Sequence, residues 1–191
     1  MIEDMIKAVM SDAEFREYSG IDTTPKLFWA KAHPDTIIPT KRDEDAGYDI
    51  YARFDEDYIL IKPSETKMIP TDLHCAIASD YVLILKERGS TGSKGLGQRC
   101  GVIDSGFRGS IFVPVTNHNT YPVIIGKKHV TLRDVFGDIA PNGTIIYPYE
   151  KAICQGVVQK VPNLLSMEIK LDELLNIDSE RGQGMLGDSG K

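Results

Sequence analysis

The chain has 191 residues, of which 41% are hydrophobic and 26% are charged, and its formal net charge at pH 7 is −6. This length predicts one ordinary domain with a sizeable core, since the composition is typical of globular proteins. No apolar run approaches the ~18 residues that a membrane-spanning helix needs, and the negative charge disfavours contact with a nucleic-acid backbone. The sequence therefore predicts neither a membrane protein nor a nucleic-acid-binding protein.

The first segment, residues 1–24, predicts an amphipathic helix that ends near Gly20. Its apolar residues recur at helical spacing and are Ile2, Met5, Ile6, Val9 and Met10. Acidic residues in the first turns and the lack of an uninterrupted apolar centre argue against a secretory signal, so we expect a cytoplasmic protein. The three cysteines, Cys75, Cys100 and Cys154, are widely spaced and predict reduced packing residues rather than a disulfide framework or a zinc site.

From residue 25 to 177 the sequence predicts an all-β domain. Short β-rich runs lie at 26–32, 48–52, 58–61, 67–70, 81–85, 111–115, 123–125, 145–147 and 152–161. Pro, Gly, Asp and Asn separate these runs, a pattern typical of a β-sandwich, a jelly roll or a barrel. The alternating segment SMEIKLDEL at 166–174 predicts a last strand, whereas the glycine-rich tail at 178–191 cannot bury a core of its own.

Two polar segments in the first half of this domain could carry chemistry. In DAGYDIYA, residues 45–52, Asp45 and Asp49 lie four apart on a predicted strand, so they share a face and suit a hydrated divalent cation; the alternative is a solvated strand edge. ERGSTGSKGLG, residues 87–97, combines glycines, hydroxyls and two cations. It suits a phosphate cradle or a flexible basic loop, and it lacks the spacing of a Walker motif.

A third segment, GVIDSGFRG at 101–109, predicts a β-hairpin whose second arm is Ile111–Val113. Asp104 stands at its corner, where a carboxylate among apolar neighbours needs a pairing partner, a metal or a role as a base, unless it only closes an Asx turn. Two weaker signals follow. Gln155 lies in the apolar strand 151–161 and Arg181 in the tail; each has a plain alternative, an edge residue for Gln155 and disorder for Arg181.

The order of these five segments, from Asp45 to Gly190, resembles the five motifs of the trimeric dUTP pyrophosphatase (dUTPase) family. The resemblance implies a jelly-roll-like (β-clip) subunit in a homotrimer with shared active sites. It also implies hydrolysis of dUTP to dUMP and pyrophosphate, which limits uracil in DNA and supplies dUMP for dTMP synthesis.

The resemblance also implies roles for single residues. Asp49 would hold Mg²⁺ through its waters, and Asp104 would bind the deoxyribose and orient the water that attacks the α-phosphorus. Arg88 and Gln155 complete the implied catalytic set. The implied substrate-binding residues are Gly89, Ser90, Lys94, Gln98, Gly101, Ile103, Phe107, Arg181, Leu186 and Ser189. Among them, Phe107 would exclude a 2′-hydroxyl, Gly101 and Ile103 would border the uracil slot, and the tail at 178–191 would close as a lid.

The sequence departs from the family pattern in several places. Gly89 shifts the second-motif hydroxyl to Ser90, while Leu186 and Asp188 replace the aromatic and hydroxyl residues of the fifth motif. The helix in 1–24 and the long stretch 118–149 resemble additions in phage-encoded members, some of which bind a partner protein. A nucleotide-binding regulator that acts through this insertion is therefore the main alternative. The related dCTP deaminase is disfavoured, because Pro114 stands near the place of its glutamate base.

Overall fold

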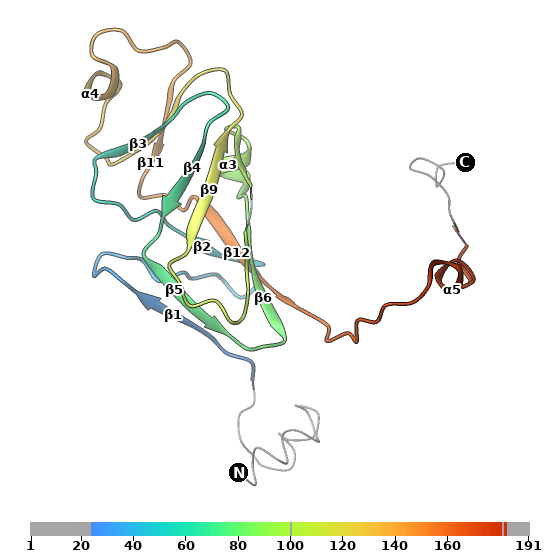
Figure 1. Cartoon of the computed structure of the whole chain (residues 1–191). Coiled ribbons are helices and arrows are strands. Elements are labelled where there is room, and N and C mark those ends of the chain that lie inside the picture. Colours follow the sequence, from blue (N-terminus) through green and yellow to red (C-terminus); the bar gives the residue numbers. More distant parts are fainter. Residues whose placement is uncertain (1–23, 100, 181, 183–191) are drawn as a thin grey trace. The chain divides into compact units, whose positions relative to one another are not determined.

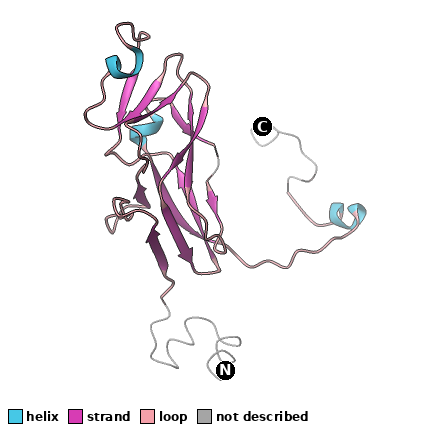
Figure 2. Ribbon diagram, turned by 60° about the vertical axis from the view of Figure 1, so that its left-hand side comes forward, coloured by secondary structure: helices cyan, strands magenta, loops and turns pink. Residues whose placement is uncertain are grey.

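The computed structural model describes residues 24–99, 101–180 and 182. The helix predicted within 1–24 therefore lies almost entirely outside the described residues. Strands dominate the described chain, and its helices are short (Figure 2). None of the described helices has the length and apolar character that crossing a bilayer requires. The predicted all-β fold is confirmed.

The strands form four small sheets (Figure 1). The first pairs β1 (Leu27–Lys31) with β5 (Leu73–Ile77). The second has the order β11 (Ile145–Pro148), β10 (Val123–Gly126), β3 (Tyr58–Ile61). The third has the order β2 (Gly47–Ile50), β12 (Cys154–Lys160), β6 (Tyr81–Lys86), β8 (Val102–Ile103). The fourth has the order β4 (Thr66–Pro70), β9 (Phe112–Asn117), β7 (Leu96–Gln98).

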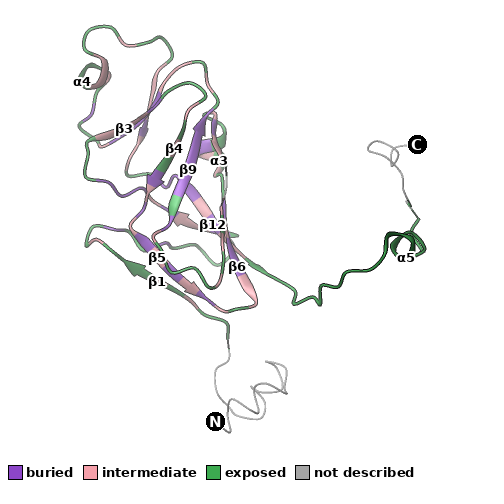
Figure 3. Cartoon of the chain, viewed as in Figure 1, coloured by how far each residue is buried: buried purple, intermediate pink, exposed green. Residues whose placement is uncertain are grey.

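The core forms where the inner faces of these sheets meet, as the buried segments of Figure 3 show. Alternate side chains of a strand point to opposite faces, so β5 buries Leu73, Cys75 and Ile77 and leaves His74 and Ala76 partly exposed. Strand β10 is instead buried along its whole length, because β3 and β11 flank it. This core fixes the third sheet, which carries the polar segments.

Two of the short helices lie in connections between strands, and the third follows the last strand, β12. They are α3 (Gly89–Gly92), α4 (Leu132–Phe136) and α5 (Leu171–Leu175). A boundary between two structural units falls between Val161 and Pro162. In the second unit, the last strand predicted over 166–174 is wrong: residues 162–170 form no regular element and α5 follows. This segment alternates charged and apolar residues, but it pairs with no neighbouring strand in the described part of the chain and therefore stays irregular.

The hairpin predicted from GVIDSGFRG is wrong, although its turn is present. The turn closes through the Phe107 amide, which donates to the Asp104 carbonyl at 3.0 Å. Strand β8, however, pairs with β6, whereas β9 pairs with β4 and β7. The second arm is diverted because the Ile111 amide donates to the Leu73 carbonyl at 2.8 Å and the Thr71 hydroxyl donates to the Ile111 carbonyl at 2.7 Å.

Candidate active site

A polar cavity of about 560 Å³ opens at one end of the third sheet. Its walls come from the loop before β2, from β2 and β12, and from the start of α3. The lining residues are Thr40, Lys41, Arg42, Asp45, Gly47, Asp49, Arg88, Gly89, Ser90 and Gln155. Residues from the first, second and fourth sequence segments therefore meet in one place, as the resemblance implied for Asp49, Arg88, Gly89, Ser90 and Gln155.

Arg88 and Asp49 form a two-pronged ion pair in this cavity. The Arg88 Nε lies 2.9 Å from the Asp49 Oδ1, and an Arg88 Nη donates to the Asp49 Oδ2 at 3.1 Å. The other Nη donates at 3.3 Å both to the Ser90 hydroxyl and to the Ala152 carbonyl. Both side chains remain about one third exposed, at 29% and 35%. The fork holds the guanidinium plane in place while leaving it accessible to an anionic ligand.

Gln155 is positioned by strand register. On β12 it lies opposite Asp49 of β2 and opposite Lys86 of β6. Its Nε2 donates to the Glu87 carbonyl at 2.9 Å, which ties β12 to the residue before Arg88. A Cβ at Gly47 would lie 2.8 Å from the Gln155 Oε1, so glycine is needed there for the side chain to occupy this position.

The loop before β2 is closed by a second arginine fork. Arg42 donates from Nε and Nη2 to the two Asp45 oxygens at 2.8 and 2.9 Å, and the Arg42 hydrogen bond lowers the pKa of that carboxyl. Asp45 precedes β2, so the expectation that Asp45 and Asp49 share one strand is wrong, although both line the cavity. Thr40, Lys41 and Arg42 were not predicted as site residues; the basic pair ahead of DAGYD was the available signal.

A second cavity, of about 260 Å³, lies between β6 and the segment 98–102. Gln98 and Gly101, two of the residues expected to bind substrate, line it. The backbone N–H of Gln98 donates to the Glu87 Oε1 at 2.8 Å, and this hydrogen bond lowers the pKa of Glu87. The sequence did not predict this contact. A Cβ at Gly101 would lie 2.7 Å from the Leu85 carbonyl oxygen, so glycine allows the two strands to approach here.

The remaining third-segment residues lie away from the first cavity. Ile103, Asp104 and Phe107 line neither cavity, and Asp104 is exposed rather than buried among apolar side chains. Because Ile103 pairs with Leu83, Asp104 stands beside the start of β6, whereas Arg88 follows its end. At ~3.3 Å per residue this separates the two by roughly 20 Å.

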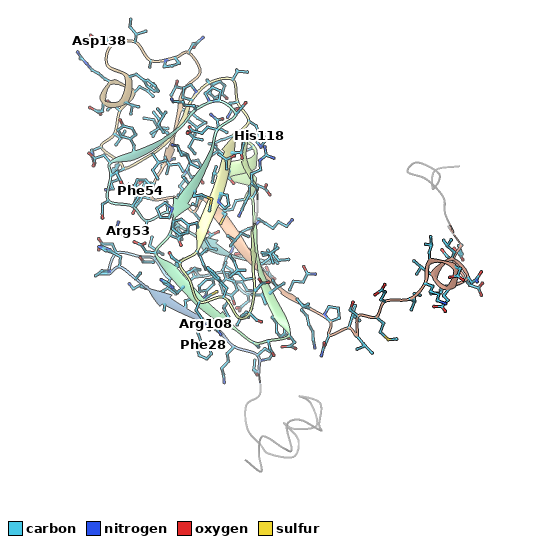
Figure 4. All side chains as sticks on the ribbon, viewed as in Figure 1. Phe28, Arg53, Phe54, Arg108, His118 and Asp138 are labelled. Atoms are coloured by element: carbon cyan, nitrogen blue, oxygen red, sulfur yellow. The ribbon has the colours of Figure 1, made fainter. Side chains whose placement is uncertain are left out.

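In Figure 4, Arg108, which follows Asp104 in the turn, lies low in the β domain near Phe28, and His118 lies well above it. His118 stands beside the end of the second segment, since its amide donates to the Gly95 carbonyl at 2.8 Å. Lys94 is exposed and lines neither cavity. Arg181, Leu186 and Ser189 lie outside the described residues.

The described residues contain no group of three or more His, Cys, Asp or Glu side chains able to hold a metal ion directly. Asp45 and Asp49 do offer hard oxygen atoms to the first cavity, but each carboxylate already forms an ion pair with an arginine. Such a donor set fits an ion that keeps most of its own waters and takes further ligands from phosphates, which is how Mg²⁺ commonly binds.

Comparison with known proteins gives consistent matches. A family model described as dUTPase matches residues 33–130. The deoxyuridine 5′-triphosphate nucleotidohydrolase of Nautilia profundicola is 30% identical over 170 residues, which are 87% of this chain and 99% of that protein. The Pol polyprotein of caprine arthritis encephalitis virus is 34% identical over 109 residues, 56% of this chain. The chain spans only 9% of that polyprotein's length.

Solved structures give the same result for the fold. The Staphylococcus bacteriophage 80alpha dUTPase with dUPNHPP has a TM-score of 0.64 and 24% identity, with 87% of this chain and 99% of that chain covered. At this level of identity the likeness concerns the arrangement of the backbone. The jelly-roll-like fold expected from the sequence thus agrees with a solved dUTPase structure.

Proposed function

The chain belongs to the dUTPase family, and from this membership we propose that it hydrolyses dUTP to dUMP and pyrophosphate. The observation that carries the proposal is the convergence of Asp49, Arg88 and Gln155 on one cavity. The dUMP released would supply dTMP synthesis, and removal of dUTP would limit uracil in DNA. We expect this to take place in the cytoplasm of a cell or of an infected host.

The phosphate chain would occupy the first cavity. Hydrolysis at the α-phosphorus is an in-line displacement in which a protein mainly positions groups and neutralises charge. Arg88 suits this task because its fork is already oriented by Asp49, and the Gly89 backbone and the Ser90 hydroxyl lie on the same wall. Gln155 would hold the adjoining backbone of Glu87 and present its amide oxygen to the substrate. Lys94 would reach the phosphates from the end of the second segment.

Mg²⁺ is the proposed cofactor, held by Asp49 through water. When bound, it would neutralise the triphosphate oxygens. Because Arg88 contacts both Asp49 carboxylate oxygens, Asp49 would reach the ion only through the ion's waters.

The nucleoside would bind to third-segment residues. Gly101 and Ile103 would border the uracil, with Gln98 beside them, while Phe107 would pack against the sugar and Asp104 would orient the attacking water. Asp104 and Arg88 lie at opposite ends of β6, so one chain cannot bring both to one substrate. We therefore propose that a neighbouring copy in a homotrimer contributes Asp104 and Phe107.

Exposed apolar side chains support such an assembly. Val102 at the edge of the third sheet is 65% exposed, and Met68 and Phe112 on the fourth sheet are 56% and 43% exposed. Apolar groups of this size on strands commonly mark surfaces that another chain covers.

Subunit complementation tests the shared site. Arg88→Ala and Asp104→Asn should each abolish most turnover, whereas chains unfolded together and refolded at equal amounts should recover about a quarter of the wild-type rate. That fraction follows because a site drawing Arg88 from one copy and Asp104 from another is intact in one of four random pairings. A mixture as inactive as its components would exclude the shared site.

The substrate is tested by measuring pyrophosphate release from dUTP, dCTP, dTTP and UTP, with and without Mg²⁺. We expect release from dUTP alone, and Asp104→Asn should bind nucleotide but lose most turnover because it removes the base and keeps the shape. Lack of release from dUTP by the wild-type protein would refute the proposed activity. Conversion of dCTP to dUTP would identify the deaminase instead.

The proposed lid consists of residues 178–191 with Arg181, Leu186 and Ser189. A chain ending at Asp178 should lose turnover, and unchanged turnover would remove the tail from the mechanism. The alternative of a regulator rests on the insertion 118–149, where Ile139 is 87% exposed and where none of the residues that line the first cavity lies. Deleting 129–140 should leave dUTP hydrolysis intact and would abolish binding to any partner protein that recognises this segment.

A further inference from the structure

The cavity contains an unbalanced positive charge. Its lining includes three cations, Lys41, Arg42 and Arg88, and two carboxylates, Asp45 and Asp49. Each carboxylate accepts a fork from one arginine. Among the described residues, Lys41 is thus the lining cation that no ion pair or side-chain hydrogen bond joins to a carboxylate, although Asp45 lies near enough for Lys41 to help lower the pKa of that carboxyl. With two carboxylates against three cations, the cavity keeps one positive charge for an anion.

The ammonium group of Lys41 is held only by weak contacts. Its Nζ donates to the backbone carbonyls of Arg42 and Asp43 at 3.2 and 3.4 Å, and lies 5.8 Å from the centre of the Tyr48 ring. These contacts are exposed and near the long limit for hydrogen bonds, so exchanging them for a phosphate oxygen costs little. Lysine also has four rotatable side-chain bonds, which let the head group move while the backbone stays fixed.

The backbone that carries Lys41 is well anchored. The Thr40 carbonyl accepts from the Asp49 amide at 3.0 Å, and the Arg42 carbonyl accepts from the Asp45 amide at 3.1 Å. The side-chain fork between Arg42 and Asp45 closes the same loop. Lys41 therefore projects from a fixed loop on the wall formed by residues 40–45, whereas Arg88, Gly89 and Ser90 belong to a different wall.

From this arrangement we propose that Lys41 is a specificity-determining residue that binds the terminal phosphate of the substrate's polyphosphate chain and makes the site prefer triphosphates to monophosphates. This inference rests on the proposed function. The geometry favours the terminal phosphate because Arg88 and Ser90 already offer phosphate-binding groups on the wall formed by residues 88–90. A polyphosphate that continues across the cavity then reaches Lys41, whose ammonium group forms no ion pair with either lining carboxylate. The Arg42–Asp45 fork acts as the support of the loop.

The test compares three ligands with one, two and three phosphates: dUMP, dUDP and a non-hydrolysable imido analogue of dUTP. Lys41→Met should weaken the triphosphate analogue about tenfold, in line with one charge-assisted contact, and should leave dUMP unchanged. Lys41→Arg should restore most of the loss because it keeps the charge. Lys62→Met is the matched control, since Lys62 is exposed and lines neither cavity described above. In turnover, the KM for dUTP should rise while kcat changes little.

Equal weakening of all three ligands by Lys41→Met would show a structural role and overturn the inference, as would unchanged affinity for the triphosphate analogue. Failure of the proposed function is recognised separately, because the wild-type protein would then release no pyrophosphate from dUTP. Binding of inorganic tripolyphosphate tests Lys41 in that case: Lys41→Met must weaken it, and equal binding by both proteins would refute the assignment.

Discussion

Replacing Gly47 by alanine should displace the Gln155 side chain and disturb the cavity while leaving the Gln155 residue itself unchanged. The three nearest atoms to a new Cβ all belong to Gln155, at 2.8, 3.0 and 3.2 Å. The shortest of these distances is one that real Cβ atoms do not tolerate, so the amide must move. Its hydrogen bond to the Glu87 carbonyl, 2.9 Å long, would then be lost.

The expected cost combines two contributions. Loss of the hydrogen bond is worth about 1 kcal/mol, and crowding of a packed position costs a further 1 kcal/mol or more. A total of about 2 kcal/mol corresponds to a fall in Tm of roughly 4–8 °C for a chain of this length. Turnover of dUTP should fall as well, since Gln155 is a proposed catalytic residue. Gly92→Ala is a suitable control, because its Cβ would meet only the Glu87 Cβ at 4.0 Å.

A double-mutant cycle isolates the contact. A Gln155→Ala background removes Oε1 and Cδ and leaves only the Cβ at 3.0 Å, so Gly47→Ala should cost clearly less there than in the wild type. Thermal unfolding of the wild type, both single variants and the double variant measures the coupling. An equal fall in Tm in both backgrounds would refute the idea that Gly47 exists to admit Gln155.

Three further outcomes are expected. Because Arg42 lowers the pKa of Asp45, their ion pair stabilises the fold at pH values above the unfolded-state pKa of about 3.9. This contribution disappears as the pH falls through the lower folded-state pKa. Arg42→Gln should therefore raise the Asp45 pKa, as measured by an NMR titration. Burial raises the pKa of the Cys75 and Cys154 thiols, so both should resist alkylation until the protein unfolds, as mass spectrometry can follow. Arg88→Lys should reduce kcat at least tenfold by losing the fork, with at most about 1 kcal/mol of stability lost in denaturant titrations.

Strands with a strong local pattern could be predicted from the sequence, whereas their partners could not. The strand Tyr58–Ile61 was predicted with the bounds that the structure shows. The strand Leu73–Ile77 was missed although its buried and exposed side chains alternate, because His74 and the preceding turn obscure the pattern. The pair Val102–Ile103 is too short to specify a partner. Its pairing with β6 instead of β9 is decided by long-range contacts, which local spacing does not contain.

The candidate site shows the same division. The residue types of Asp49, Arg88 and Gln155 are visible in the sequence, but their meeting depends on the register that sets Gln155 opposite Asp49. Only the order of the motifs anticipated it. Lys41 was overlooked because it belongs to no motif, and its importance becomes visible only when the charges around the cavity are paired.

The order of strands in the third sheet connects the fold to the proposed assembly. With β12 between β2 and β6, the residues that line the first cavity gather at one end of the sheet, while β8 is left as an edge strand with Val102 exposed. An open apolar edge invites pairing or burial by another chain. A neighbouring copy that covers this edge would protect it and would place the turn carrying Asp104 at a surface between chains. The position of β8 therefore gives a physical reason for the proposed division of the active site between copies, because the exposed apolar edge is followed directly by the turn proposed to bind the nucleoside.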